Sequence, residues 1–153
     1  MKKYGKIIIV LAVAILIIVL VVVLKNKSLN KTDLQNDFGS IEYSNDSPWG
    51  GSTKVKLSSN HELEFTFDDS SEDVTIKTLT DTEYNSFMEK LTNSGIEKLP
   101  EKMGVEGNES SLGFSHQTIT INLLNGNKFE RSGYAIEEQE FKTVVQALLD
   151  LTK

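Results

Sequence analysis

An uninterrupted apolar run near the N-terminus constrains this chain more than any other feature. From Ile7 to Leu24 every residue is Ile, Val, Leu or Ala, which makes 18 apolar residues without a polar one. At about 1.5 Å per residue a helix of this length spans about 27 Å, close to the ~30 Å hydrocarbon core of a bilayer. The many β-branched residues do not prevent a helix, because backbone groups in lipid have no water to bond. The run therefore predicts one transmembrane helix.

The alternative is a signal peptide that is cleaved from the mature protein. The apolar part of a signal peptide is typically about 7–15 residues long and ends at small residues. This run is longer, and Leu24 is followed by Lys25, Asn26 and Lys27. We therefore expect an uncleaved signal anchor over residues 7–24, preceded by a basic flank over residues 1–6.

Lysines lie on both sides of the run, so their number does not set its orientation. Three precede it and three come after it, namely Lys2, Lys3, Lys6, Lys25, Lys27 and Lys31. The free amino group adds one charge to the N-terminal side, and a basic segment before a long apolar run is the usual export signal. We expect a single-pass protein of the cell membrane whose C-terminal domain is extracytoplasmic.

The chain after the run is acidic. Three of the 16 basic residues precede the run, so the 129 residues after it carry 13 basic side chains against 22 acidic ones, a net charge of −9. This balance argues against a nucleic-acid partner, which requires a basic surface. The chain has no Cys, which excludes disulfides, Cys-ligated zinc, iron–sulfur clusters and thiol nucleophiles. A chain of this length forms one domain.

Residues 25–52 are rich in Asn, Ser, Asp, Lys and Gly, and their few apolar residues follow no sustained period. We interpret this region as a polar linker. The turn-forming residues at 45–51 mark the entrance of an α+β domain over residues 53–153.

Alternating apolar residues predict strands over residues 53–57, 62–67 and 74–78. Thr80 and Glu83 have the spacing of a capping box, which starts a helix. An apolar stripe at helical spacing comes next, and Gly95 is placed to end the helix. The stripe consists of Tyr84, Phe87, Met88 and Leu91. Residues 100–115 show little pattern and are expected to form a long loop.

In the second half, polar and apolar residues alternate over residues 118–123, which predicts a strand. Its partner strand is expected over residues 127–134. Asn125-Gly126 between them is the strongest hairpin signal in the chain and favours a type I′ turn. A second helical stripe runs to the C-terminus through Phe141, Val144, Val145, Leu148 and Leu149. The order β-β-β-α-β-β-α predicts one twisted antiparallel sheet of about five strands with two helices packed on one face.

Residue patterns that carry chemistry are scarce. His61 falls in a predicted turn and His116 at the start of a strand, and neither has a metal ligand at helical spacing. The acidic residues of 68–73 lack the Gly and Glu positions of an EF-hand loop. No G-x-S-x-G elbow and no glycine-rich phosphate loop is present. We expect no cofactor, no metal and no catalysis.

The candidate contacts for a partner lie where the predicted helices do not pack. The opposite face of the sheet is expected to carry acidic residues and threonines, namely Glu62, Glu64, Thr66, Thr118 and Thr120. Residues 100–115 form a loop, and two aromatic residues are adjacent to glycines near strand ends. The residues singled out are Trp49, Glu62, Glu64, Met103, His116 and Tyr134.

Three functions are compatible with this pattern. The first is a binding or accessory module that recognises a protein or a cell-envelope polymer at the outer membrane surface. The second is an immunity or inhibitor protein that intercepts a toxin or a protease there, since an acidic surface suits a basic aggressor. The third, an envelope hydrolase, requires a converging nucleophile and base, and only two histidines are available. We favour the first function.

Overall fold

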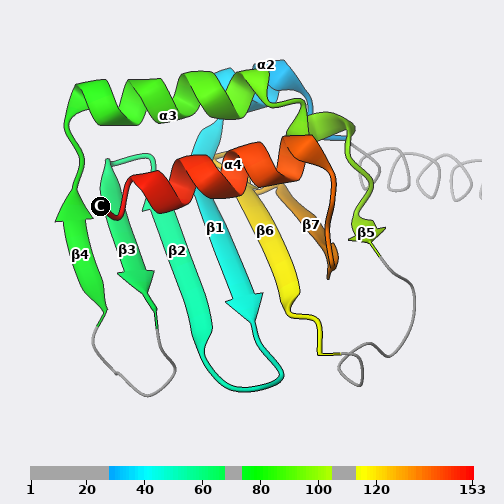
Figure 1. Cartoon of the computed structure of the whole chain (residues 1–153). Helices are drawn as coiled ribbons and strands as arrows, with labels where there is room; N and C mark the ends of the chain where they lie inside the picture. The colour runs from blue at the N-terminus through cyan, green and yellow to red at the C-terminus, as the bar shows by residue number, and fades with distance from the viewer. Residues whose placement is uncertain (1–27, 68–73, 105–112) are drawn as a thin grey trace, which may run out of the picture.

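The structure is a computed structural model that describes residues 28–67, 74–104 and 113–153. Within these ranges the chain forms a small α+β domain in which three helices cover one side of a seven-stranded mixed sheet (Figure 1). None of the described helices is long and apolar enough to cross a membrane. The apolar run at 7–24 lies outside the described residues, and so do the acidic residues of 68–73.

The sheet has the strand order β4-β3-β2-β1-β6-β7-β5. All neighbouring strands are antiparallel except β5 and β7, which are parallel. The strands are β1 (Phe38–Asp46), β2 (Ser52–Ser58), β3 (Glu62–Thr66), β4 (Thr75–Thr78), β5 (Lys102–Gly104), β6 (His116–Leu123) and β7 (Lys128–Tyr134). The helices are α2 (Lys31–Asn36), α3 (Asp81–Asn93) and α4 (Gln139–Asp150), with a short 3₁₀ helix, η1 (Ile96–Lys98), after α3.

The expected number of strands, about five, is wrong, and the sheet is not purely antiparallel. β5 lies inside the expected loop at 100–115, and α2 and β1 lie inside the expected linker at 25–52. β1 is central, because it pairs with both β2 and β6. Its Phe38, Ile41 and Tyr43 are buried, so residues 31–46 belong to the folded domain and not to a linker.

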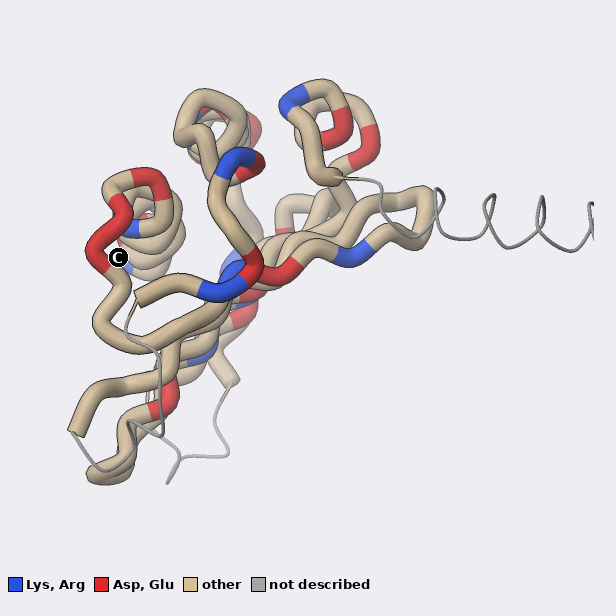
Figure 2. The backbone as a smooth tube through the Cα atoms, turned by 90° about the vertical axis from the view of Figure 1, so that its right-hand side faces the viewer, with Lys and Arg blue, Asp and Glu red and all other residues tan. Residues whose placement is uncertain are grey.

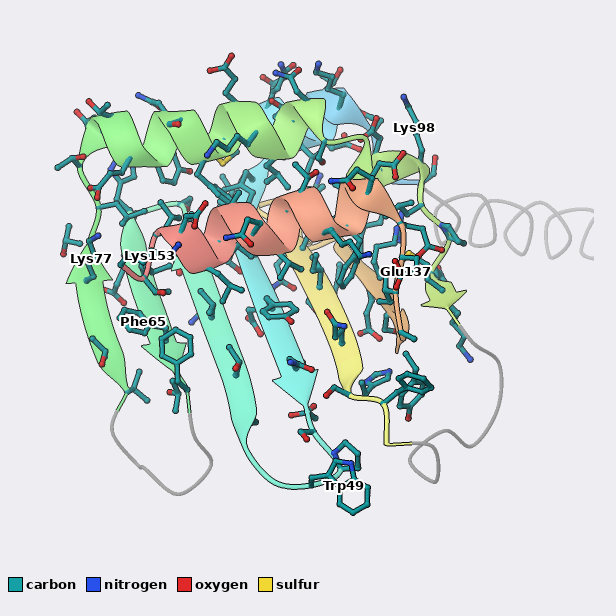
Figure 3. The ribbon with its side chains drawn as sticks, viewed as in Figure 1. Trp49, Phe65, Lys77, Lys98, Glu137 and Lys153 are labelled. Carbon is teal, nitrogen blue, oxygen red and sulfur yellow. The ribbon has the colours of Figure 1, made fainter. Side chains whose placement is uncertain are left out.

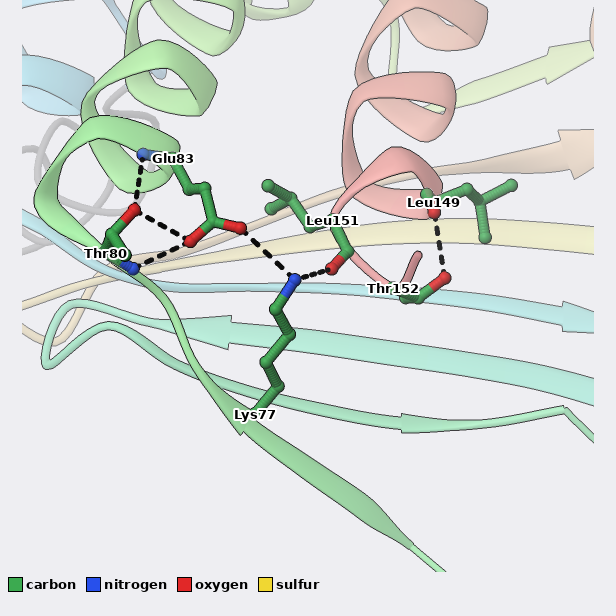
Figure 4. Close-up of polar contacts among 6 residues, drawn as sticks. All are labelled: Lys77, Thr80, Glu83, Leu149, Leu151 and Thr152. Carbon is green, nitrogen blue, oxygen red and sulfur yellow. Dashed lines mark hydrogen bonds and ion pairs between the residues drawn. The ribbon is translucent and has the colours of Figure 1, made fainter.

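The predicted start of the first long helix is confirmed. In α3 the Thr80 side chain accepts a hydrogen bond from the Glu83 backbone N–H, and the Glu83 carboxylate accepts one from the Thr80 N–H at 2.8 Å (Figure 4). Lys77 of β4 donates to Glu83 at 3.2 Å and to the Leu151 carbonyl at 3.1 Å. The edge strand is thereby joined to the beginning of α3 and to the end of α4.

The predicted hairpin at Asn125-Gly126 is also present, as the connection between β6 and β7. Its turn type differs from the expectation, because Gly126 has a positive φ and Asn125 does not. The Gly126 N–H donates to the Leu123 carbonyl and the Leu123 N–H donates to the Asn127 carbonyl. This arrangement is a type I turn followed by a left-handed glycine, and not the type I′ turn.

The core lies between the helices and the sheet. Phe87 and Leu91 of α3 and Phe141, Val144 and Leu148 of α4 are all buried, as their stripes predict. They pack against apolar residues of the five neighbouring strands β3, β2, β1, β6 and β7. Figure 2 shows the helices on one side of the sheet and no described element on the other side. We call that uncovered side the open face.

Candidate functional site: the open face of the sheet

The open face is built by alternate residues of neighbouring strands. Strand pairing places Ile76, Glu64, Lys56, Glu42, Thr120 and Glu130 in one row across the sheet. A second row beside it contains Thr66, Lys54, Ser44, Thr118 and Ser132. Since successive side chains of a strand point to opposite faces, both rows point away from the helices. The prediction that Glu64, Thr66, Thr118 and Thr120 share the face opposite the helices is confirmed.

A shallow groove of about 350 Å³ runs along this face. Several side chains of both rows line it, together with Val74, the residue before β4. Those that carry charge or hydroxyl groups are Glu42, Ser44, Lys54, Lys56, Glu64, Thr66, Thr118 and Thr120. The groove therefore offers donors and acceptors from adjacent strands, and its floor is the rigid sheet.

Charges of both signs alternate in the groove, which corrects the expectation of an acidic face. Lys56 lies between Glu42 and Glu64 in its row, and its Nζ is 3.0 Å from Glu64 Oε1. The hydrogen bond to Glu64 is the main reason why the pKa of Lys56 is raised above its ordinary value. Lys54 is exposed in the neighbouring row. The sequence missed this pattern because acidic residues dominate β3, whereas both lysines lie on β2.

The two histidines lie at opposite ends of the sheet. His61, in the turn between β2 and β3, stacks on Tyr84 at 4.0 Å, and its Nδ1 is 3.4 Å from Asp81 Oδ1. His116 begins β6, at the end of the sheet opposite His61. Its ring lies beside Tyr134, with 4.8 Å between the ring centroids. One site therefore cannot use both histidines. Among the described residues no group of three His, Asp or Glu side chains could hold a metal ion.

Tyr43 is the most strongly perturbed ionisable group on the central strand. Burial raises its pKa to about 12, and its hydroxyl donates to Gln117 Oε1 at 3.2 Å. A phenol with such a pKa stays protonated at neutral pH and cannot serve as a general base. The Tyr43 side chain belongs to the core beneath the groove.

The remaining sequence candidates lie apart from one another. Trp49, at the tip of the β1–β2 hairpin, is 84% exposed (Figure 3). Glu62 is half-buried on β3, at the end of the sheet opposite Trp49. Met103 is buried on β5, so it does not offer a contact to a partner. Tyr134 is half-buried against His116. Residues 105–112 of the expected loop lie outside the described residues.

The burial of Arg131 was not among the predictions from the sequence. Arg131 of β7 is 7% exposed, and its Nη1 donates to the Glu130 carbonyl at 2.9 Å. Burial lowers the pKa of this guanidinium, and the negative charge of Glu101 partly offsets the effect. Phe129 and Gly133, two positions before and after Arg131, lie on the same inner face of β7. The strand predicted over residues 127–134 therefore already implied that Arg131 points inward.

No protein-family model, curated protein or solved structure matches this chain.

Proposed function

We propose that this chain is a non-catalytic binding module, held at the extracytoplasmic face of a membrane, that recognises a protein or a cell-envelope component. The open-face groove is its binding site. The helices use their apolar sides for the core, so the groove is a hollow that a partner could enter without disturbing the fold.

The observation that carries this proposal is the alternation of lysine and glutamate along the groove. Antiparallel sheets often leave one face to water, and scattered charges would suffice for that. Here Glu42, Lys56 and Glu64 stand in register on three strands, with Thr120 next to Glu42 and with Thr66 and Thr118 in the second row. Such a row suits a partner that presents its own charges and hydroxyls in a fixed order, as a protein segment or a substituted glycan does.

The membrane part of the proposal comes from the sequence. The run at 7–24 has the length and composition of a membrane-spanning helix, and the basic N-terminal flank favours export of the domain after it. A binding module fixed at a membrane meets its partner at a high local concentration, so a modest affinity of the groove is sufficient.

The groove can be tested by photo-crosslinking of the full-length chain in its native membrane. A photoreactive residue at Thr118, in the groove, should give an adduct with a partner. The same residue at Gln146, on α4 on the opposite side and exposed, should not. The identity of the adduct distinguishes the variants of the proposal, because a toxin or a protease would favour the inhibitor function.

Charge reversal provides the matched control. Lys56→Glu should abolish the Thr118 adduct because it places three carboxylates side by side, at positions 42, 56 and 64, whereas Lys98→Glu on the surface of η1 should leave the adduct unchanged. Circular dichroism of both variants checks the fold. Adducts that form at Gln146 and not at Thr118, or that survive Lys56→Glu, would contradict the groove as the binding site.

A further inference from the structure

The folded domain begins very close to the apolar run. Leu29 is 3% exposed, and Asn30 caps α2 by accepting a hydrogen bond from the Asp33 N–H at 2.9 Å. The run ends at Leu24, so only residues 25–28 separate the two. Even fully extended, four residues reach at most about 14 Å. The linker expected up to residue 52 would have given the domain a far longer reach.

A short connection determines which end of the domain faces the membrane. α2 lies at the end of the sheet where β1 begins (Figure 1). The β6–β7 turn lies at the same end, because the Leu124 N–H donates to the Asp37 carbonyl at 2.7 Å and the Asn125 side chain donates to the Asp37 carboxylate at 3.3 Å. The turn therefore lies beside the end of α2, about 9 Å, the length of this six-residue helix, from the point where the chain enters the domain.

The tip of the β6–β7 turn exposes an apolar side chain. Leu124 is 69% exposed at the tip of the turn. Its exposed neighbours in the turn and in the last two residues of α2 carry no charge, and they are Gln35, Asn36, Asn125 and Gly126. We refer to these four residues and Leu124 as the proximal end.

We propose that the proximal end rests on the lipid headgroups of the membrane and that Leu124 inserts into the interfacial layer. This inference depends on the proposed membrane anchor and adds a defined orientation to it. An apolar side chain gains by leaving water for the interface, and uncharged polar neighbours can bond to headgroups without the cost of burying a charge.

The orientation determines how a partner reaches the groove. β1 has nine residues, so at ~3.3 Å per residue the sheet extends about 30 Å from the proximal end to the opposite end, where Trp49 lies. The strands then point away from the membrane, and the open face stands upright on it. A partner approaches the groove from the side, along the membrane surface, and Trp49 is the part farthest from the lipid.

Fluorescence quenching can test this orientation because the chain has no Cys and a single Trp. The full-length chain is incorporated into vesicles of phosphatidylcholine and phosphatidylglycerol, some of whose headgroups carry a nitroxide. A fluorophore is attached to Leu124→Cys, or to Asn125→Cys as a second probe of the proximal end. We expect strong quenching of either label and none of the intrinsic Trp49 fluorescence. Gln146→Cys, exposed on α4, provides a labelled control.

The results separate this inference from the anchor on which it depends. If the vesicles retain the chain but the labels at 124 and 125 are not quenched, the orientation is wrong and the anchor stands. Quenching of Trp49 with unquenched labels would mean that the opposite end faces the lipid, which also overturns the inference. A chain that does not float with the vesicles would overturn both the anchor and the orientation.

Discussion

Gly133 and Gly104 are the residues that allow β5 to join the sheet. A Cβ added to Gly133 would lie 1.9 Å from the Met103 carbonyl oxygen, and one added to Gly104 would lie 1.8 Å from the Tyr134 carbonyl oxygen. Real Cβ atoms do not approach backbone so closely, so two glycines are required where β5 and β7 run side by side.

Gly133→Ala should therefore separate β5 from β7. The added methyl group collides with backbone that cannot move alone, and we expect a loss of about 1–3 kcal/mol in the free energy of unfolding. Hydrogen exchange should show lost protection at residues 102–104 while β1 and β2 stay protected. Ser132→Ala, the neighbouring position on the open face, serves as the control. Unchanged protection of β5 in Gly133→Ala would contradict the close approach.

The histidines provide a test of the proposal that the module is non-catalytic. His61 and His116 are at opposite ends of the sheet, and each contacts a tyrosine ring. Replacing both by Gln should leave partner capture at the groove intact, because neither residue lines it. The Thr118 photo-adduct of the double variant is the measurement. If that adduct and the biological phenotype vanish while the fold survives, a catalytic or metal site must be sought instead.

At the scale of elements, the sequence predicted the structures whose signals are local. A capping box, an apolar stripe and a glycine defined α3, and alternation defined β2, β3, β4, β6 and β7. β1 was missed because a register shift between Phe38 and Ser40 puts Phe38 and Ile41 out of alternation. β5 was missed because three residues are too few to show a period. Both depend on pairing with strands far away in the sequence, which periodicity does not reveal.

The candidate site, too, depends in part on strand pairing that periodicity does not reveal. Alternation within β3 and β6 correctly placed Glu64, Thr66, Thr118 and Thr120 on one face. The position of Lys56 between two glutamates depends on the register of β1, β2 and β3, and β1 was not predicted.

Glu83 makes the start of α3 sensitive to acid. Hydrogen bonds from the Thr80 backbone and side chain and from Lys77 lower the pKa of Glu83 from 4.5 to about 2. The Glu83 carboxylate therefore takes up a proton at a higher pH in the unfolded chain than in the folded chain. The free energy of unfolding thus decreases as the pH falls from about 4.5 to about 2. Thermal unfolding between pH 7 and pH 2 should show a shallower acid-induced loss in Glu83→Gln than in the wild type. Glu89→Gln, exposed on the same helix, should keep the wild-type slope; identical slopes for all three would contradict this role.

At the scale of the whole molecule, the fold depends on residues that precede the expected domain boundary. A fragment of residues 28–153 should unfold cooperatively in denaturant. A fragment of residues 53–153 should not, because it loses the central strand and exposes the inner edges of β2 and β6. Circular dichroism and near-ultraviolet signals from the tyrosines can follow both fragments. Cooperative unfolding of the shorter fragment would show that β1 is dispensable.

The most direct test of a binding module held outside the membrane is protease protection of the full-length chain. Protease added to intact cells or protoplasts should digest residues 28–153 while cytosolic markers survive, and a fragment containing the apolar run should stay in the membrane pellet after an alkaline carbonate wash. Full protection of the chain until the cells are lysed, or release of a shortened and soluble chain before any protease is added, would contradict the account.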